Sequence, residues 1–101
     1  DIPAYQMSAF AELLAALAAT PAVPSGTLLD ATLLFGTSEY GEGWQHSDKE
    51  MPVLLAGRAC GALNPGVHVR EPGGNISKAH VTMLRAIGID TPSFGFNGGE
   101  T

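Results

Sequence analysis

The chain has 101 residues, of which 45% are hydrophobic and 15% charged, a composition typical of one small globular domain and not of a disordered segment. The net charge of −5 and the scattered positions of the five lysines and arginines argue against binding to nucleic acid or to an anionic membrane surface. The single cysteine, Cys60, excludes both an intrachain disulfide and a thiolate metal cluster.

The first predicted element is a helix. Large apolar side chains recur at the i, i+3, i+4 and i+7 spacing of one helical face. They are Phe10, Leu13, Leu14 and Leu17. Two prolines at 21 and 24 end this helix in a rigid turn. The apolar run 10–19 is interrupted by Glu12, is shorter than a bilayer crossing and lacks a basic leader, so we expect neither a membrane span nor a signal peptide.

Two short apolar runs predict strands over residues 32–36 and 52–57. Continuous apolar runs of this kind are typical of strands that are covered on both faces of a sheet. The alternation of Val67, His68 and Val69 predicts a short third strand or an edge hairpin.

A second helix is predicted after Asn75, a typical capping residue, and ends at Gly88. Its expected buried face comprises Ile76, Ala79, His80, Met83, Leu84 and Ile87. In the remaining tail, Phe94 and Phe96 are expected to anchor the chain to a core.

These elements predict an α/β fold with two to three strands flanked by two helices. So few elements would hardly bury both faces of a sheet, which indicates that residues 1–101 are either a single small domain or a portion of a larger α/β domain. The chain begins with Asp1 and not Met, as a processed or truncated product would.

The loop between the two predicted strands contains most of the potential ligands. They are Glu39, Tyr40, Glu42, Trp44, His46, Asp48, Lys49 and Glu50. The loop follows the carboxyl end of a strand, where open α/β sheets place their binding sites. Glu39, His46 and Asp48 together offer oxygen and nitrogen donors suited to zinc, manganese or a related divalent ion. The chain has no HExxH, EF-hand or paired-cysteine motif, so a solvated acidic loop is the alternative.

Other candidate residues have simpler interpretations. His68 is expected to face solvent or cap a carbonyl, and His80 to be a packed core histidine. Neither Ser38 nor Ser47 lies in a GxSxG motif, so we assign no catalytic residue to this chain. Trp44 would either stack on a ligand or fold back onto the protein.

The order of several segments resembles a known family. The segments are LLDATLLFGTSEYGEG, a His-containing loop, MPVLLAGR, NISKAHVTMLRAIGID and PSFG. Together they resemble the carboxy-terminal part of the HXXSHH family of uncharacterised bacterial proteins. That family is similar to the sulfatase and alkaline-phosphatase-like superfamily.

The resemblance implies a large alkaline-phosphatase-like α/β sandwich in which this chain supplies only the last strands and helices. It places Glu39 at an acidic metal-ligand position, Tyr40 at the position of a first histidine ligand and His46 at that of a later one. Tyr40 departs from the family pattern. The resemblance also places the nucleophile and the remaining metal ligands in an amino-terminal half that this chain does not contain, and it implies a periplasmic or secreted protein.

Two functions remain open. The first is a non-catalytic, structural or binding role, with the missing amino-terminal half or another polypeptide as partner. The alternative is part of a secreted, metal-dependent phosphoesterase or sulfatase-type hydrolase. In that case Glu39 and His46 would bind a divalent metal such as zinc, and Asp48 would be a ligand or a partner of one.

Overall fold

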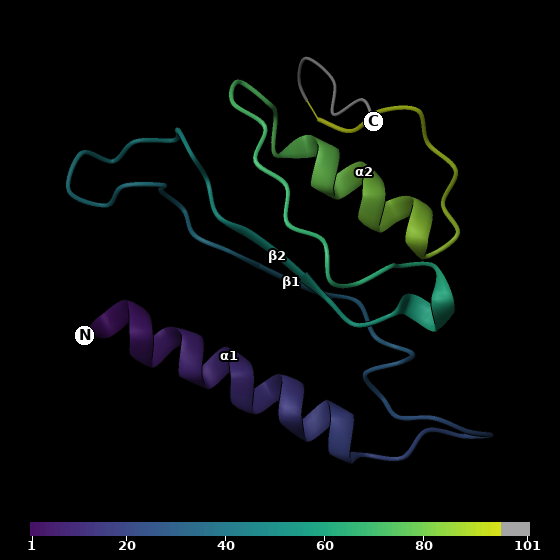
Figure 1. The fold of residues 1–101 in the computed structure, drawn as a ribbon. Helices are drawn as coiled ribbons and strands as arrows, with labels where there is room; N and C mark the ends of the chain where they lie inside the picture. Colours follow the sequence, from purple (N-terminus) through teal and green to yellow (C-terminus); the bar gives the residue numbers. More distant parts are fainter. Residues whose placement is uncertain (96–101) are drawn as a thin grey trace. The chain divides into compact units, whose positions relative to one another are not determined.

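The computed structural model describes residues 1–95 and contains two α-helices, two strands and one short 3-10 helix in that range. In chain order these are α1 (Ile2–Ala19), β1 (Leu34–Thr37), β2 (Val53–Ala56), the 3-10 helix Ala59–Gly61 and α2 (Ser77–Ala86) (Figure 1). The predicted α/β class, with two strands flanked by two helices, is therefore confirmed.

The two strands pair with each other in an antiparallel sheet. Where the strands meet the connecting loop, the Thr37 hydroxyl donates to the carbonyl oxygen of Pro52 at 2.8 Å. The predicted third strand is wrong: residues 67–69 are irregular and their two valines are exposed. A strand needs a neighbouring edge that accepts and donates backbone hydrogen bonds, and residues 67–69 have none within the described part of the chain.

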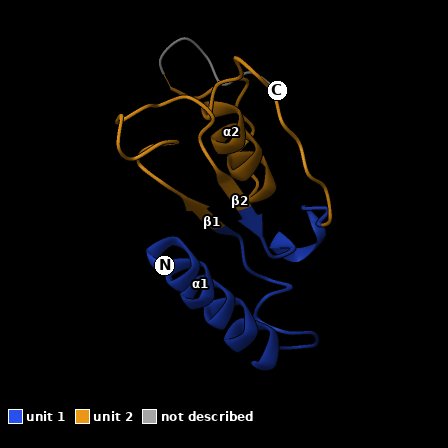
Figure 2. Cartoon of the chain, turned by 60° about the vertical axis from the view of Figure 1, so that its left-hand side comes forward, with its two compact units in different colours: residues 1–34, 55–65 blue, residues 35–54, 66–101 orange. Residues whose placement is uncertain are grey.

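The chain divides into two compact units (Figure 2). Unit 1 comprises residues 1–34 and 55–65, and unit 2 comprises residues 35–54 and 66–101. Because the division passes through both strands, each unit contains one part of β1 and one part of β2.

In unit 1, α1 begins with a proline in its first turn, where the missing N–H is not needed for the helical hydrogen bonds. Phe10, Leu14 and Leu17 of the predicted apolar face are half-buried, whereas Leu13 is exposed. None of the 18 residues of α1 is buried. By length and composition alone α1 is apolar enough to cross a membrane, a property that soluble core helices and signal sequences share, so the expected absence of a membrane span stays a prediction.

The predicted turn after α1 folds back on the end of the helix. Pro21 and Thr27 form an isolated antiparallel bridge, and the amide of Leu28 donates to the carbonyl of Thr20 at 2.8 Å. The turn that follows joins the segment after β2, because the amide of Cys60 donates to the carbonyl of Asp30 at 2.8 Å. Gly57 is required at this junction, since a Cβ atom there would lie 2.1 Å from the carbonyl oxygen of Thr32.

In unit 2, α2 ends as predicted, because Gly88 follows it with a φ of +91°. At its start the cap residue is Ile76, which makes no side-chain cap hydrogen bond, and not the predicted Asn75. Asn75 lies one residue earlier, where its side chain accepts a hydrogen bond from the amide of Ser77 at 2.9 Å. Val81 of α2 is the one fully buried residue among residues 1–95. The predicted buried face did not include Val81, and it included Ile87, which is 61% exposed.

His80 lies between two phenylalanine rings of the same unit. Its ring is stacked on that of Phe94 at a centroid distance of 5.0 Å and tilted against that of Phe35 at 5.2 Å. The prediction of a packed histidine at position 80 is thus confirmed, whereas Phe94 contacts His80 but is 43% exposed and is not buried in a core. Phe96 lies outside the described residues.

Candidate functional site

The ligand-rich loop of residues 38–52, in unit 2, contains a small hairpin of its own. Glu42 and Ser47 form an antiparallel bridge. The amide of Ser47 donates to the carbonyl of Glu42 at 3.2 Å, and the amide of Gly41 donates to the carbonyl of Ser47 at 2.8 Å. We call residues 40–47 the loop hairpin. Its four-residue turn, 43–46, ends at His46, whose φ is +51°.

Gly41 lets the two sides of the loop pass close to each other. A Cβ atom at this position would lie 1.8 Å from the carbonyl oxygen of Lys49, a distance that no side chain tolerates. A Cβ atom at Gly43, two residues later, would meet nothing within 4 Å. The two glycines therefore have different roles: Gly41 is a packing requirement and Gly43 is not.

Two predicted site residues are in contact at the base of the loop hairpin. The rings of Tyr40 and His46 are stacked, with their centroids 4.5 Å apart and their planes 7° apart. Tyr40 is half-buried and His46 is exposed. The resemblance assigned both residues to ligand positions, and the structure brings these two positions side by side.

Trp44 projects from the turn of the loop hairpin. It is 78% exposed, and its indole N–H donates to a carboxylate oxygen of Glu42 at 2.5 Å. The interpretation that this tryptophan folds back onto the protein is therefore wrong. An exposed indole whose ring plane is held by a neighbouring carboxylate can contact a ligand or another protein.

Glu50 is a carboxylate of the loop that pairs with a charged side chain. Its two oxygens accept from the Arg70 guanidinium, with Nη2 to Oε1 at 2.6 Å and Nε to Oε2 at 3.2 Å. This ion pair connects the loop to residues 66–72, although both side chains are exposed and the pair contributes little stability. Within residues 1–95, Glu39 and Asp48 are exposed and form no ion pair.

The predicted metal ligands do not form a metal centre by themselves. Among residues 1–95, no group of three or more His, Cys, Asp and Glu side chains is arranged to hold a metal ion. Glu39, His46 and Asp48 thus lack the convergence that a zinc or manganese site needs. Metal binding stays a prediction for a larger domain that supplies further ligands, and we derive no chemical step through a metal.

The two loop serines take part in local backbone contacts. The Ser38 hydroxyl oxygen accepts from the amide of Tyr40 at 3.3 Å, and that of Ser47 accepts from the amide of Lys49 at 3.2 Å. Such contacts stabilise turns and need no catalytic role. His68, predicted to face solvent or cap a carbonyl, is exposed.

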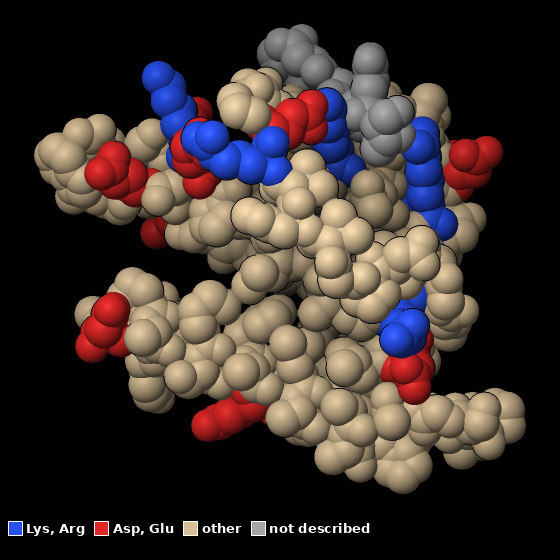
Figure 3. Space-filling model, in the orientation of Figure 1, with Lys and Arg blue, Asp and Glu red and all other residues tan. Residues whose placement is uncertain are grey.

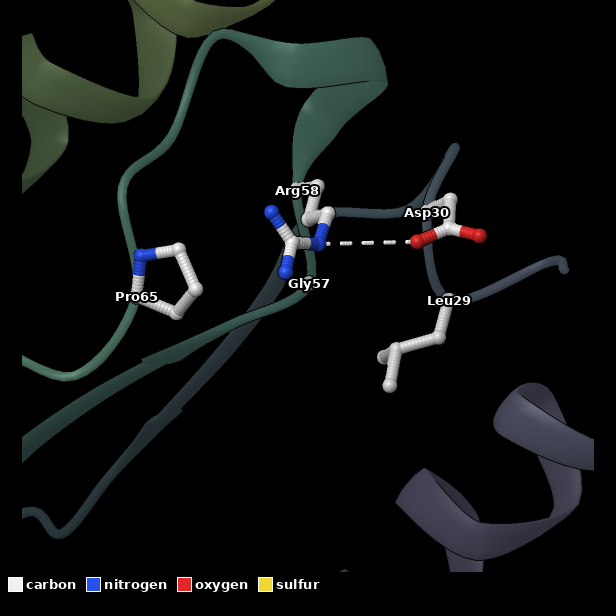
Figure 4. A pocket seen from close by; sticks show the side chains of 5 residues that line it. All are labelled: Leu29, Asp30, Gly57, Arg58 and Pro65. Carbon is white, nitrogen blue, oxygen red and sulfur yellow. Dashed lines mark ion pairs between the residues drawn. The ribbon is translucent and has the colours of Figure 1, made fainter. Parts of the chain in front are cut away.

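Unit 1 contains a pocket that the sequence reasoning did not identify. Leu29, Asp30, Gly57, Arg58 and Pro65 line it (Figure 4). The Nε atom of Arg58 lies 3.6 Å from Oδ1 of Asp30. The acidic and the basic side chain of this lining therefore form an ion pair. The pocket draws on three separate segments of the chain, and no local sequence pattern indicates such a site.

The carboxylate of Asp30 also accepts hydrogen bonds from Thr27. The amide and the hydroxyl of Thr27 donate to Oδ2 of Asp30 at 2.9 and 3.2 Å. The hydrogen bonds from Thr27, first the amide and then the hydroxyl, hold the pKa of Asp30 below its ordinary value of 3.8, with a smaller contribution from Arg58. An ionised Asp30 neutralises Arg58, so this pocket has little net charge with which to select a charged ligand.

No protein-family model matches this chain, and comparisons with curated proteins and with solved structures found no similar protein. The resemblance to the HXXSHH family therefore stays a prediction.

Proposed function

We propose that this chain has a structural or binding role as one part of a larger α/β domain, completed by another segment or a separate polypeptide. One observation carries the proposal: the described residues bury too little of their apolar surface. Val81 alone is fully buried in residues 1–95, whereas thirteen large hydrophobic side chains in that range are exposed. Isolated exposed apolar residues are normal, but a fold with one buried side chain lacks a core of ordinary size.

Covering the exposed apolar side chains would supply the hydrophobic stabilisation that the chain alone lacks.

Both units contribute to the exposed surface. In unit 1, α1 has no buried residue and exposes Ile2 and Tyr5. In unit 2, the exposed residues include Leu54 of β2 and the two valines at 67 and 69. Each strand has one edge that no other strand in residues 1–95 pairs with, and such an edge can accept a further strand.

Native mass spectrometry of the protein purified from its source tests this proposal. We expect a complex heavier than the 10.4 kDa chain that contains a second, larger polypeptide, and its dissociation under denaturing conditions. Hydrogen exchange should also slow on α1 and at residues 67–69 in the complex relative to the free chain. A lone chain under native conditions, with cooperative unfolding by denaturant, would show a self-sufficient small domain and overturn the proposal.

The alternative function is part of a secreted, metal-dependent phosphoesterase or sulfatase-type hydrolase. In that function Glu39 and His46 would supply two of the metal ligands. The completing segment would supply the remaining ligands and the nucleophile. The contact between Tyr40 and His46 is compatible with that arrangement. Metal analysis of variants of the free chain and of the complex separates the two functions, as described in the Discussion.

A further inference from the structure

We propose that the loop hairpin of residues 40–47 is a docking surface for a basic protein segment, which places an arginine or lysine side chain against Trp44. The inference rests on the proposed function, because the basic segment would belong to the polypeptide that completes the domain. It goes further by naming the contacting surface and the chemistry of the partner.

Trp44 has the properties of a binding anchor. It is 78% exposed although an indole is among the largest apolar groups in proteins, and tryptophan is enriched at the centres of protein interfaces. Its hydrogen bond to Glu42 restricts the orientation of the ring. A side chain that is already ordered loses less conformational entropy when a partner binds.

The backbone below Trp44 is also held in place. The bridge between Glu42 and Ser47 closes the loop hairpin, and the stacked rings of Tyr40 and His46 lie at its base. The loop hairpin therefore presents Trp44 at a turn that these contacts close.

Charge selects the partner. Residues 38–52 contain four carboxylates and one lysine, a net charge of −3, and Arg70 pairs with one of these carboxylates, Glu50, which leaves −2. Figure 3 shows acidic side chains at the left of the view, with Lys and Arg side chains among them. The Glu42 carboxylate lies at the edge of the indole, so a cation on the ring face would gain both a cation–π contact and attraction to Glu42. An acidic partner would be repelled by the same carboxylates.

Binding of a labelled peptide tests the docking surface directly. The probe is a short synthetic peptide that alternates arginine with leucine, and its control is a peptide of equal length with glutamate in place of arginine. Fluorescence anisotropy of the labelled peptide gives the affinity for the full chain. Trp44 is the single tryptophan of the chain, so its intrinsic fluorescence reports separately whether the probe contacts the loop hairpin.

We expect the basic peptide to bind and the acidic peptide not to bind. Trp44→Ala should weaken binding by about tenfold or more, as loss of an interface anchor does. Glu42→Gln should weaken it less, because the indole remains. Tyr5→Ala is the matched control: Tyr5 is a 76% exposed aromatic residue of unit 1, and its loss should leave the affinity unchanged. No binding of the basic peptide, or equal affinity for wild type and Trp44→Ala, would overturn the inference.

Hydroxyl-radical labelling of the native complex separates this inference from the proposed function. We expect lower labelling of Trp44 in the complex than in the free chain. Equal labelling in a complex that does form would overturn the docking surface and leave the proposed function standing. A protein that forms no complex would overturn the proposed function, and the peptide experiment would then decide on the docking surface alone.

Discussion

Asp30 is the residue that connects two turns of unit 1. Its carboxylate accepts hydrogen bonds from Thr27 and pairs with Arg58, and its carbonyl accepts from the amide of Cys60. The hydrogen bonds from Thr27, and to a smaller extent the Arg58 charge, favour the ionised carboxylate and lower the pKa of Asp30. Because the folded pKa is below the unfolded one, the stabilisation is complete above the ordinary value of 3.8 and is lost as the pH falls through the lower, folded pKa.

Thr27→Val removes the hydroxyl donor and keeps the amide donor. We expect the pKa of Asp30 to rise toward 3.8 without reaching it, because the amide of Thr27 contributes most to the shift. NMR titration of the Asp30 carboxyl carbon measures this change. Thr91→Val, in unit 2, should leave the titration of Asp30 as in wild type. An unchanged titration in Thr27→Val would show that the hydroxyl contact is absent in solution.

Among the elements, the loop hairpin depends on close backbone packing at one glycine. Gly41 lies against the carbonyl of Lys49, while Gly43 faces open space. Neither glycine has a positive φ, so substitution by alanine tests steric contact and not backbone strain.

Gly41→Ala should destabilise the chain by about 1–3 kcal/mol, the usual cost of forcing an extra carbon into packed structure. Gly43→Ala should change the free energy of unfolding by less than about 0.5 kcal/mol. Urea denaturation followed by circular dichroism measures both, and Trp44 fluorescence shows whether the loop hairpin itself has changed. Equal effects of the two substitutions would contradict the close approach of Gly41 and Lys49.

Val81 of α2 is the fully buried side chain of the described residues. Its substitution therefore tests the small core of unit 2. Val81→Ala should lower the free energy of unfolding by about 2 kcal/mol, through lost burial and the cavity that remains. Val23→Ala is the same substitution at a 97% exposed position and should be nearly neutral. Thermal or urea unfolding measures both variants, and a neutral Val81→Ala would mean that unit 2 has no fixed core in the free chain.

At the scale of the whole molecule, the main property is the small number of buried side chains. Because Val81 alone is fully buried among residues 1–95, the chain has exposed apolar side chains to cover before it reaches the stability of an ordinary domain. A partner that binds only the folded chain would stabilise it through mass action. Metal binding would also need a partner, because the potential ligands of this chain do not converge within residues 1–95.

Glu39→Ala and His46→Ala should therefore leave the zinc content of the free chain unchanged after dialysis. Elemental analysis by mass spectrometry measures it, with Glu12→Ala as a control for loss of one carboxylate on α1. If zinc bound to the complex disappears in Glu39→Ala and His46→Ala but not in Glu12→Ala, the metal-dependent hydrolase becomes the better function. Unchanged metal in all three variants would exclude Glu39 and His46 as ligands.

The sequence by itself determined the elements whose cause is local. The two helices, the two strands and the stop at Gly88 follow from apolar periodicity and from the conformational limits of individual residues, which act over a few positions. The half-buried His80 was predictable for the same reason, since it lies beside the apolar face of a helix.

Only the tertiary structure decided the contacts between distant segments. It showed that residues 67–69 pair with no strand within residues 1–95, that Asp30 and Arg58 line one pocket, and that His80 is stacked on Phe94. It also decided the form of the candidate site, where the loop closes on itself, stacks Tyr40 on His46 and leaves Trp44 exposed. Local patterns do not determine such contacts, because they depend on the path that brings separated residues together and on which backbone groups remain free to pair.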